Sequence, residues 1–148
     1  MAKEICVFCG KEIGYVRSEY ITCGPVGQYA CKSCAKEVAS LGETDKCRMV
    51  LQRGYTTSRA AMEEYIAMVD GAEEARPACL RCGAKLKFGA AVTLDDTPYR
   101  DGLLASDGFA ILPAYCQNCG KMEIYNPGYI GNNKLLSFLV KKDTGANV

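Results

Sequence analysis

The chain of 148 residues contains no histidine and no tryptophan. Histidine is the side chain that titrates closest to neutral pH, and it is one of the usual ligands of zinc. Without it, a general base would have to be a perturbed Glu, Lys or Cys, and no pair of carboxylates is spaced to suggest one. Any zinc site must consist of cysteines or include a carboxylate. We therefore expect a protein that is not an enzyme.

Long apolar segments are also missing. The longest candidate, residues 135–140, is interrupted by Ser137 and is far shorter than the roughly 20 residues that cross a bilayer. The first five residues lead directly into a cysteine pair, without the apolar core of a secretory signal. We expect a cytoplasmic protein with no membrane partner. In that compartment thiols stay reduced, and paired cysteines indicate metal binding more often than disulfides.

Neither sign of charge is in excess. The 18 Lys and Arg residues face 17 Asp and Glu residues, for a formal net charge of +1. Two sites that each hold one Zn²⁺ on four thiolates would change this value to about −3. Proteins that bind nucleic acid usually carry a clear basic surface. The composition therefore favours a protein partner over nucleic acid, and it gives no indication of the oligomeric state.

What the sequence does have is cysteine, with ten residues of this type. Eight of them form four Cys-x-x-Cys pairs: Cys6 and Cys9, Cys31 and Cys34, Cys79 and Cys82, Cys116 and Cys119. The spacing forms a tight turn that directs both sulfurs to one point, which is half of a tetrahedral thiolate site. Glycine directly follows three of the pairs, and at positive φ it lets backbone N–H groups turn toward the sulfurs. Four pairs predict two structural Zn²⁺ ions per chain.

The cysteine pattern has three alternatives to structural zinc. A disulfide framework would suit an even number of cysteines, but the repeated spacing and the missing secretory signal oppose it. A thioredoxin-like redox pair would require one such motif in a βαβ pattern, which is absent. Iron fits four thiolates as well as zinc does. The loops Cys79–Cys82 and Cys116–Cys119 resemble the iron-binding loops of rubredoxin, although the chain lacks tryptophan and the proline of the second rubredoxin loop. The choice between zinc and iron at this site stays open.

The four cysteine pairs could bind two metal ions in either of two arrangements. Sequential grouping joins the first pair with the second and the third with the fourth, whereas a cross-braced arrangement joins the first with the third. Loop-closure entropy separates them little, because each doubling of loop length costs about 0.6 kcal/mol. Each sequential half has its own predicted hairpin that ends at its second pair. This local pattern favours sequential grouping and leaves the cross-braced arrangement open.

Residues 1–42 form the first predicted module. We expect strands at 13–16 and 20–22, and a helix at 35–41 that Gly42 ends. A cysteine knuckle, a hairpin and a second cysteine pair at the start of a helix resemble the treble-clef zinc finger. The motif Cys6-x-x-Cys9-Gly-Lys-x-Ile-Gly resembles a family of small bacterial zinc-finger domains of unassigned function. That resemblance implies a metal site and no activity.

Residues 43–78 form a predicted helical connector. A first helix, capped at Thr44 or Asp45, runs to Arg53 and ends at Gly54. A second helix starts after Thr57 or Ser58. It carries an apolar stripe with helical spacing, which we expect to face a core. The stripe consists of Met62, Tyr65, Ile66 and Val69.

Residues 79–148 form the second predicted module. Alternating patterns predict strands at 85–88, 109–115 and 121–125, with Pro113 at a sheet edge or a bulge. Residues 95–107 are expected to form a long loop. Residues 135–142 fit a helix capped at Asn132 or Asn133, or else a final strand, and residues 145–148 should be disordered.

Two cysteine knuckles that each open a hairpin resemble a zinc ribbon. Residues 115–125 resemble the predicted nucleic-acid-binding ribbons of bacteria, which implies nucleic-acid binding as the alternative function. A local basic patch beside two tyrosines would serve it. The patch consists of Arg81, Lys85, Lys87 and Lys121, with Tyr115 and Tyr125.

Cys23 and Cys47 stand outside the pairs and are expected to be small buried hydrophobes. We predict an α+β chain with two small zinc-stabilised modules, one treble-clef-like and one zinc-ribbon-like. Its function would be that of a protein-interaction or regulatory module with two structural sites, each made of four cysteines.

Overall fold

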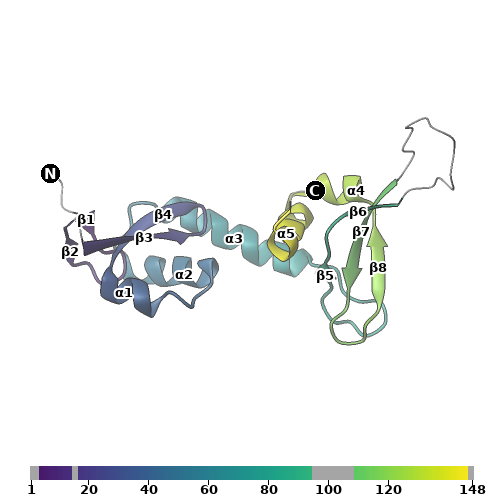
Figure 1. Cartoon of the computed structure of the whole chain (residues 1–148), viewed down its shortest axis with the longest axis horizontal. Helices are drawn as coiled ribbons and strands as arrows, with labels where there is room; N and C mark the ends of the chain where they lie inside the picture. The colour runs from purple at the N-terminus through teal and green to yellow at the C-terminus, as the bar shows by residue number, and fades with distance from the viewer. Residues whose placement is uncertain (1–3, 15–16, 95–108, 147–148) are drawn as a thin grey trace, which may run out of the picture. The chain divides into compact units, whose positions relative to one another are not determined.

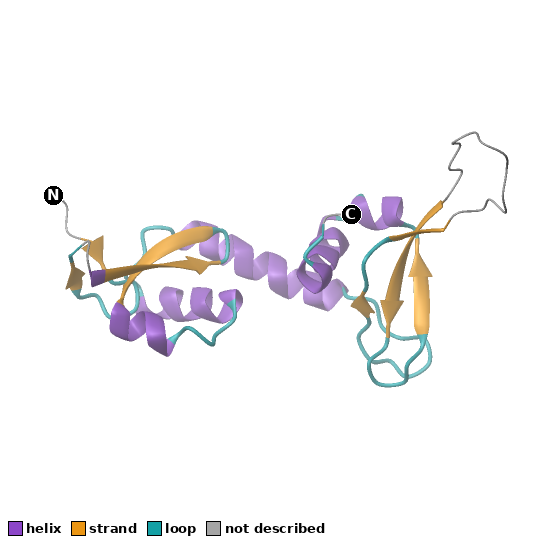
Figure 2. Cartoon of the chain, viewed as in Figure 1, coloured by secondary structure: helices purple, strands orange, loops and turns teal. Residues whose placement is uncertain are grey.

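The computed structural model describes residues 4–14, 17–94 and 109–146. It contains helices and small antiparallel sheets, so the predicted α+β class is confirmed (Figures 1 and 2). The chain divides into two compact units, residues 1–70 and residues 71–148. We call them the first and the second unit.

The strands of the first unit make two small antiparallel pairs. β1 (Glu4–Ile5) pairs with β2 (Glu12–Ile13), and the first cysteine knuckle connects them. β3 (Ser18–Cys23) and β4 (Val26–Cys31) form a longer hairpin. Its register pairs the first residue of β3 with Cys31, the last residue of β4. The hairpin therefore sets the position at which the second cysteine pair begins.

The predicted strands of this unit differ from the observed ones mainly in length. The predicted strand 20–22 lies inside β3. Of the predicted strand 13–16, Ile13 belongs to β2, and residues 15–16 lie outside the described part of the chain. The tight turn between β3 and β4 uses Gly24 at a φ of 62°, a left-handed conformation that glycine adopts at little cost.

The first helix is shorter and earlier than predicted. α1 (Lys32–Glu37) begins directly after Cys31 and its C-cap is Val38, so the predicted bounds 35–41 were wrong. The chain passes directly from β4 into α1 without a loop. The predicted helix was placed later because its prediction depended on the apolar residues that follow the second cysteine pair. Gly42 is the N-cap of the next helix and does not end α1.

α2 (Glu43–Arg53) begins close to the predicted position and ends at Gly54, whose φ of 81° is the left-handed C-cap that the sequence predicted. α3 (Arg59–Ala75) follows. The stripe on α3 faces the core as expected, because Met62 and Val69 are buried. Much of the predicted connector therefore packs within the first unit. The buried core of this unit contains Cys6, Val7, Phe8, Ile13, Cys23, Ala30, Val38, Cys47, Val50 and Met62.

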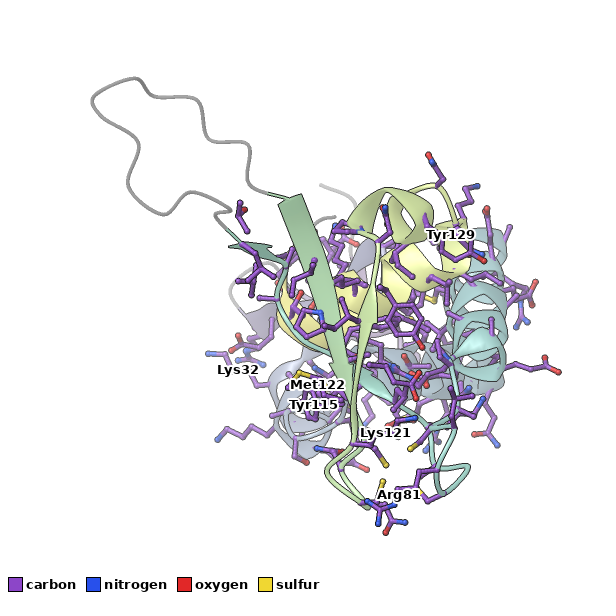
Figure 3. All side chains as sticks on the ribbon, turned by 90° about the vertical axis from the view of Figure 1, so that its right-hand side faces the viewer. Lys32, Arg81, Tyr115, Lys121, Met122 and Tyr129 are labelled. Carbon is purple, nitrogen blue, oxygen red and sulfur yellow. The ribbon has the colours of Figure 1, made fainter. Side chains whose placement is uncertain are left out.

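The second unit is built on β7 (Phe109–Tyr115), which has partners on both sides. It pairs with β8 (Met122–Tyr125) on one side, and with β5 (Lys87–Phe88) and β6 (Val92–Leu94) on the other. β7 and β8 lie side by side in Figures 1 and 3. All of these pairings are antiparallel.

Pro113 lies within β7, where a missing N–H would break a ladder. Its carbonyl accepts the N–H of Gly89 at 2.8 Å, so its nitrogen faces the side of β5 and β6. On that side residues 89–91 lie opposite residues 112–113, between β5 and β6. Three residues opposite two make a β-bulge. The proline therefore occupies a bulge, as predicted, although its strand is an inner one.

One face of this sheet packs against helices. α4 (Pro127–Gly131) begins at Asn126, whose side chain accepts the N–H groups of the next turn, and α5 (Lys134–Thr144) is capped in the same way by Asn133. The helical alternative for 135–142 is correct and the strand alternative was wrong. α4 was not predicted, although Asn-Pro at its start is a helix-start signal. The shared core contains Phe88, Leu112, Ala114, Ile130, Leu136, Leu139 and Val140.

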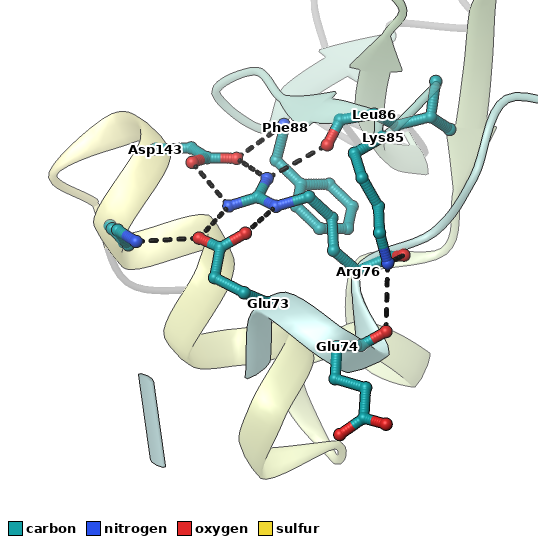
Figure 4. A network of polar contacts seen from close by, with 8 residues as sticks. Glu73, Glu74, Arg76, Lys85, Leu86, Phe88 and Asp143 are labelled. Carbon is teal, nitrogen blue, oxygen red and sulfur yellow. Dashed lines mark hydrogen bonds and ion pairs between the residues drawn. The ribbon is translucent and has the colours of Figure 1, made fainter. Parts of the chain in front are cut away.

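A buried arginine joins the last residues of α3 to this core (Figure 4). The side chain of Arg76 is 8% exposed and donates to the carboxylates of Glu73 and Asp143 and to the carbonyl of Leu86. Asp143 also accepts the N–H of Phe88 at 2.9 Å. The hydrogen bonds from Arg76 are the largest cause of a lowered pKa of Glu73, at about 2. Every charge in this cluster therefore has a partner.

Candidate metal centres

The first group of four cysteines comes from three different elements. Cys6 and Cys9 belong to the knuckle between β1 and β2, Cys31 ends β4, and Cys34 lies in α1. Their sulfur atoms all lie within 4.8 Å of one another, and the Sγ atoms of Cys9 and Cys31 are 4.0 Å apart. One residue is buried and three are half-buried. This group could hold a metal ion.

The second group comes from two knuckles of one sheet. Cys79 and Cys82 precede β5, whereas Cys116 and Cys119 connect β7 to β8. Their sulfur atoms also lie within 4.8 Å of one another, with 3.6 Å between Cys79 and Cys119 and 3.4 Å between Cys82 and Cys116. Cys82 is exposed, which distinguishes this group from the first. It too could hold a metal ion.

The sulfur separations fit a tetrahedral ion. A Zn–S distance of about 2.3 Å places two sulfurs of a tetrahedron about 3.8 Å apart, and three of the sulfur pairs lie at 3.4, 3.6 and 4.0 Å. A disulfide requires about 2.05 Å, and all ten cysteines are free thiols. The structure groups the pairs sequentially and not in the cross-braced arrangement.

Three of the four pairs have the same backbone. The N–H of the first cysteine donates to the carbonyl five residues later, and the glycine N–H donates back to the carbonyl of that cysteine. These bonds measure 2.8 to 2.9 Å in each knuckle. The glycines that close them are Gly10, Gly83 and Gly120, at φ of 70°, 73° and 72°. Positive φ is accessible to glycine at little cost, which explains the Cys-x-x-Cys-Gly pattern.

Backbone groups favour the thiolate form of Cys82 and Cys6. The pKa of Cys82 is lowered to about 6, with the backbone hydrogen bond from Ala84 as the largest cause. Burial raises the pKa of Cys6, but backbone hydrogen bonds, first that from Cys31, outweigh burial and lower it to about 7. In α1 the balance is reversed, and burial is the largest cause of the raised pKa of Cys34. A bound cation would offset that cost, because metals bind the thiolate form.

Four thiolates would complete the coordination of a tetrahedral ion. Catalytic zinc keeps one position open for water or substrate, whereas structural sites are closed by four protein ligands. The chemistry of both donor sets is therefore that of a structural site. An ion bound at either site would hold together segments that are distant in sequence.

The two remaining cysteines lie outside both groups. Cys23 at the end of β3 and Cys47 in α2 have no exposed surface and belong to the core of the first unit. Burial raises the pKa of Cys23, and it raises that of Cys47 to about 11. Both are small hydrophobic core residues, as expected.

The predicted basic patch does not come together as a group. Arg81 and Lys121 lie at the knuckle end of the second unit (Figure 3). Lys85 instead donates to the backbone carbonyls of Glu74 and Arg76 (Figure 4), and Lys121 lies 3.6 Å from the carboxylate of Glu123.

The two tyrosines of that patch lie on opposite faces of the sheet. The ring of Tyr125 packs edge-on against buried Phe88, and its hydroxyl donates to Glu123. Tyr115 pairs with Met122, three residues before Tyr125 on β8, and so lies on the other face. A base could stack on Tyr115 but not between the two rings.

Comparison of the chain with protein-family models, with curated proteins and with solved structures gives no match. Among the described helices, none combines the length and the apolarity that a bilayer crossing requires.

Proposed function

We propose that the chain is a zinc protein whose two four-cysteine sites are structural and whose folded units bind another protein. The observation that carries the metal assignment is the presence of two groups of four sulfurs, each within 4.8 Å, on a repeated knuckle backbone. Zinc is proposed over iron because the sequence motifs around both sites resemble those of zinc-binding modules. The lack of an open coordination position argues against a role in catalysis.

The module types are part of this proposal. In the first unit, a knuckle, the β3–β4 hairpin and the start of α1 supply the four sulfurs, which supports a treble-clef-like finger. In the second unit, two knuckles at one end of an antiparallel sheet supply them, which supports a zinc ribbon. We infer a cytoplasmic location because the cysteines are grouped for metal binding and not paired as disulfides, a use of cysteine that is typical where thiols stay reduced.

The metal content of the purified protein tests the proposal that both sites hold zinc. Protein purified under reducing conditions should contain two zinc ions per chain and should be colourless. A content of one ion would contradict the proposal. A red protein whose metal is mostly iron would contradict the choice of zinc and favour the rubredoxin-like alternative.

Nucleic-acid binding is the second candidate function, favoured by the exposed Arg81 and by Lys121 at one end of the ribbon. Most non-specific affinity comes from phosphate contacts, each adding about one unit to the slope of log K against log salt. With two clustered cations we expect a slope no steeper than about −2 and a Kd in the high micromolar range or weaker.

Labelled single- and double-stranded oligonucleotides, titrated across a salt series, would measure both quantities. The informative variant is Arg81→Glu with Lys121→Glu. Its matched control is Lys134→Glu with Lys141→Glu, which reverses two exposed charges on α5. Submicromolar binding at physiological salt that the first variant loses and the control keeps would replace the proposed protein partner by nucleic acid.

A further inference from the structure

The sheet of the second unit has one face that no described helix covers. Met122 and Ile124 of β8 are each 63% exposed, and Val92 and Leu94 of β6 are 46% and 41% exposed. Cross-strand pairing places these side chains in rows with half-buried residues of β7. The rows are Tyr115 with Met122, Pro113 with Ile124, and Ile111 with Val92. An apolar sheet surface of this kind is typical of an interaction site.

The same face ends at an open strand edge. In the described part of the chain, β8 pairs with β7 alone. The Cys116 N–H donates to the carbonyl of Lys121, so the backbone groups of Lys121 point toward β7. Because this direction alternates along an antiparallel strand, those of Met122 and Ile124 point away from the sheet. These two residues therefore supply both apolar side chains and unpaired backbone groups.

Positive charge borders this surface. Lys87 pairs in register with Tyr115 and shares its face, while Arg81 and Lys121 lie at the knuckle end (Figure 3). The nearby anion is Glu123, which lies on the opposite face of β8. It already accepts the N–H of Leu80 and the hydroxyl of Tyr125. Among the described residues, a partner on this face would therefore meet Lys87 and, at its end, the exposed Arg81, whereas Lys121 is paired with Glu123 on the opposite face.

We propose that the β8 edge and the adjoining apolar face bind an extended segment of a partner protein, added as a strand beside β8. This inference rests on the proposed protein-interaction function and names its site. The bound segment would carry apolar residues at alternate positions and acidic residues at the end near Arg81 and Lys87. Backbone hydrogen bonds to Met122 and Ile124 would supply affinity, and the alternating side chains would supply specificity.

Two other occupants fit the surface less well. A nucleic acid would use stacking aromatics, but this face is mostly aliphatic, with Tyr115 as its described aromatic side chain. A second copy paired through β8 would bury Met122 and Ile124. Its β8 would place Glu123 on the opposite face and no acidic side chain beside Lys87.

The probe is a phage-displayed library of random nonapeptides, selected on immobilised, zinc-loaded full-length protein. Selected sequences should alternate apolar and polar residues and should carry acidic residues at one end. The preferred peptide is then synthesised with N-methyl groups on its odd or on its even amides. Only one of these two versions should lose binding, because alternate amides of a strand face the same side.

Protein variants locate the site. Ile124→Lys should weaken the affinity of the protein for the selected peptide by about 30-fold or more, as expected at the centre of an interface. Ile124→Thr, which keeps the β-branched shape, should have a smaller effect in the same direction. Tyr129→Lys is the matched control, because Tyr129 is 67% exposed but lies on α4, away from this face. Metal content and the amide spectrum must show that each variant is folded.

The outcomes are separable. Peptides that bind Ile124→Lys unchanged would overturn this site and leave the proposed protein-interaction function standing. A concentration-dependent dimer that Ile124→Lys abolishes would assign the edge to a second copy and overturn the proposal. If no peptide is selected and oligonucleotides bind instead, this inference and the proposed function both fail.

Discussion

The two cysteine groups use the same spacing but different backbone structures. In the second unit both pairs sit in knuckles closed by positive-φ glycines, Gly83 and Gly120. In the first unit only one pair does, because Ala35 follows Cys34 and the chain continues as α1. A Cys-x-x-Cys pair is therefore compatible with a turn or with the start of a helix. The residue after the second cysteine distinguishes the two.

The groups also differ in their surroundings. Cys6 and Cys9 lie beside the core formed with α2 and α3, and no cysteine of that group is exposed. In the second unit Cys82 is exposed, and the unit gains further anchoring from the buried Arg76 cluster. With metal bound, the first unit would depend on that ion and its core, whereas the second has an ionic cluster in addition.

Loss of one ligand should have the largest effect and should separate the two units. Cys116→Ser should reduce the metal content from two to one and unfold the second unit, while Cys31→Ser should do the same to the first. Metal binding at such sites supplies on the order of 10–16 kcal/mol, which is comparable to or larger than the stability of a small domain. Elemental analysis with hydrogen exchange of each unit would measure this. Loss of both metals in either variant would contradict two separate sites.

Disruption of the arginine cluster should destabilise the second unit alone. Arg76→Met leaves the buried carboxylate of Asp143 without its cation, which typically costs about 3–5 kcal/mol. Hydrogen exchange of residues 71–148 under native conditions would report the loss. Lys142→Met is the control, because Lys142 and Glu73 form an exposed pair worth about 1 kcal/mol or less.

The same cluster gives the second unit a pH dependence. The folded pKa of Glu73 is about 2, below its ordinary value of 4.5, so its contribution to stability is complete above about pH 4.5. That contribution is lost as the pH falls toward 2. Denaturant unfolding of wild type and Glu73→Gln should therefore differ at pH 6 and converge near pH 2. A constant difference at both values would contradict the assignment.

Substitution by alanine should destabilise the protein by different amounts at Gly83 and at Gly10, although the two knuckles have the same backbone. At Gly83 a Cβ would have no neighbour within 4 Å, so the cost should be the left-handed strain of about 1 kcal/mol. At Gly10 the Cβ would lie 2.6 Å from the ring of Tyr55, which must move. Gly10→Ala should therefore cost more, as measured by denaturant unfolding. Adding Tyr55→Ala should reduce the strain at Gly10 to the value at Gly83, and an unchanged excess would exclude the ring as its cause.

The smallest effect on metal content is expected from substitution of the two core cysteines. Cys23→Ala with Cys47→Ala should leave two metal ions, because neither sulfur belongs to a group of four. Stability should fall by about 1 kcal/mol per site, since only a buried sulfur is removed. Elemental analysis decides the point, and a metal lost from this variant would show that the ligands are misassigned.

Local signals predicted local structure well and boundaries less well. Gly54 and the αL turn at the end of α2 followed from the sequence, because a glycine C-cap is a property of a few adjacent residues. The start of α1 at Lys32 did not, since the strand before it ends at Cys31 only through its register with Ser18. The bulge at Pro113 was predictable from its missing N–H. The inner position of β7 required knowledge of strands that are distant in sequence.

The sequence by itself determined the four cysteine pairs, the glycines that close three knuckles and the α+β class. These depend on covalent spacing, on φ preferences and on the periodicity of short segments. The local hairpin pattern favoured sequential grouping of the pairs, and tertiary structure decided it. Tertiary structure also placed Arg76 in a buried cluster with Asp143, 67 residues away. It also decided that Met122 and Ile124 stay on an open face. Such features arise from contacts between distant segments, whose loop-closure costs differ too little for sequence spacing to select among them.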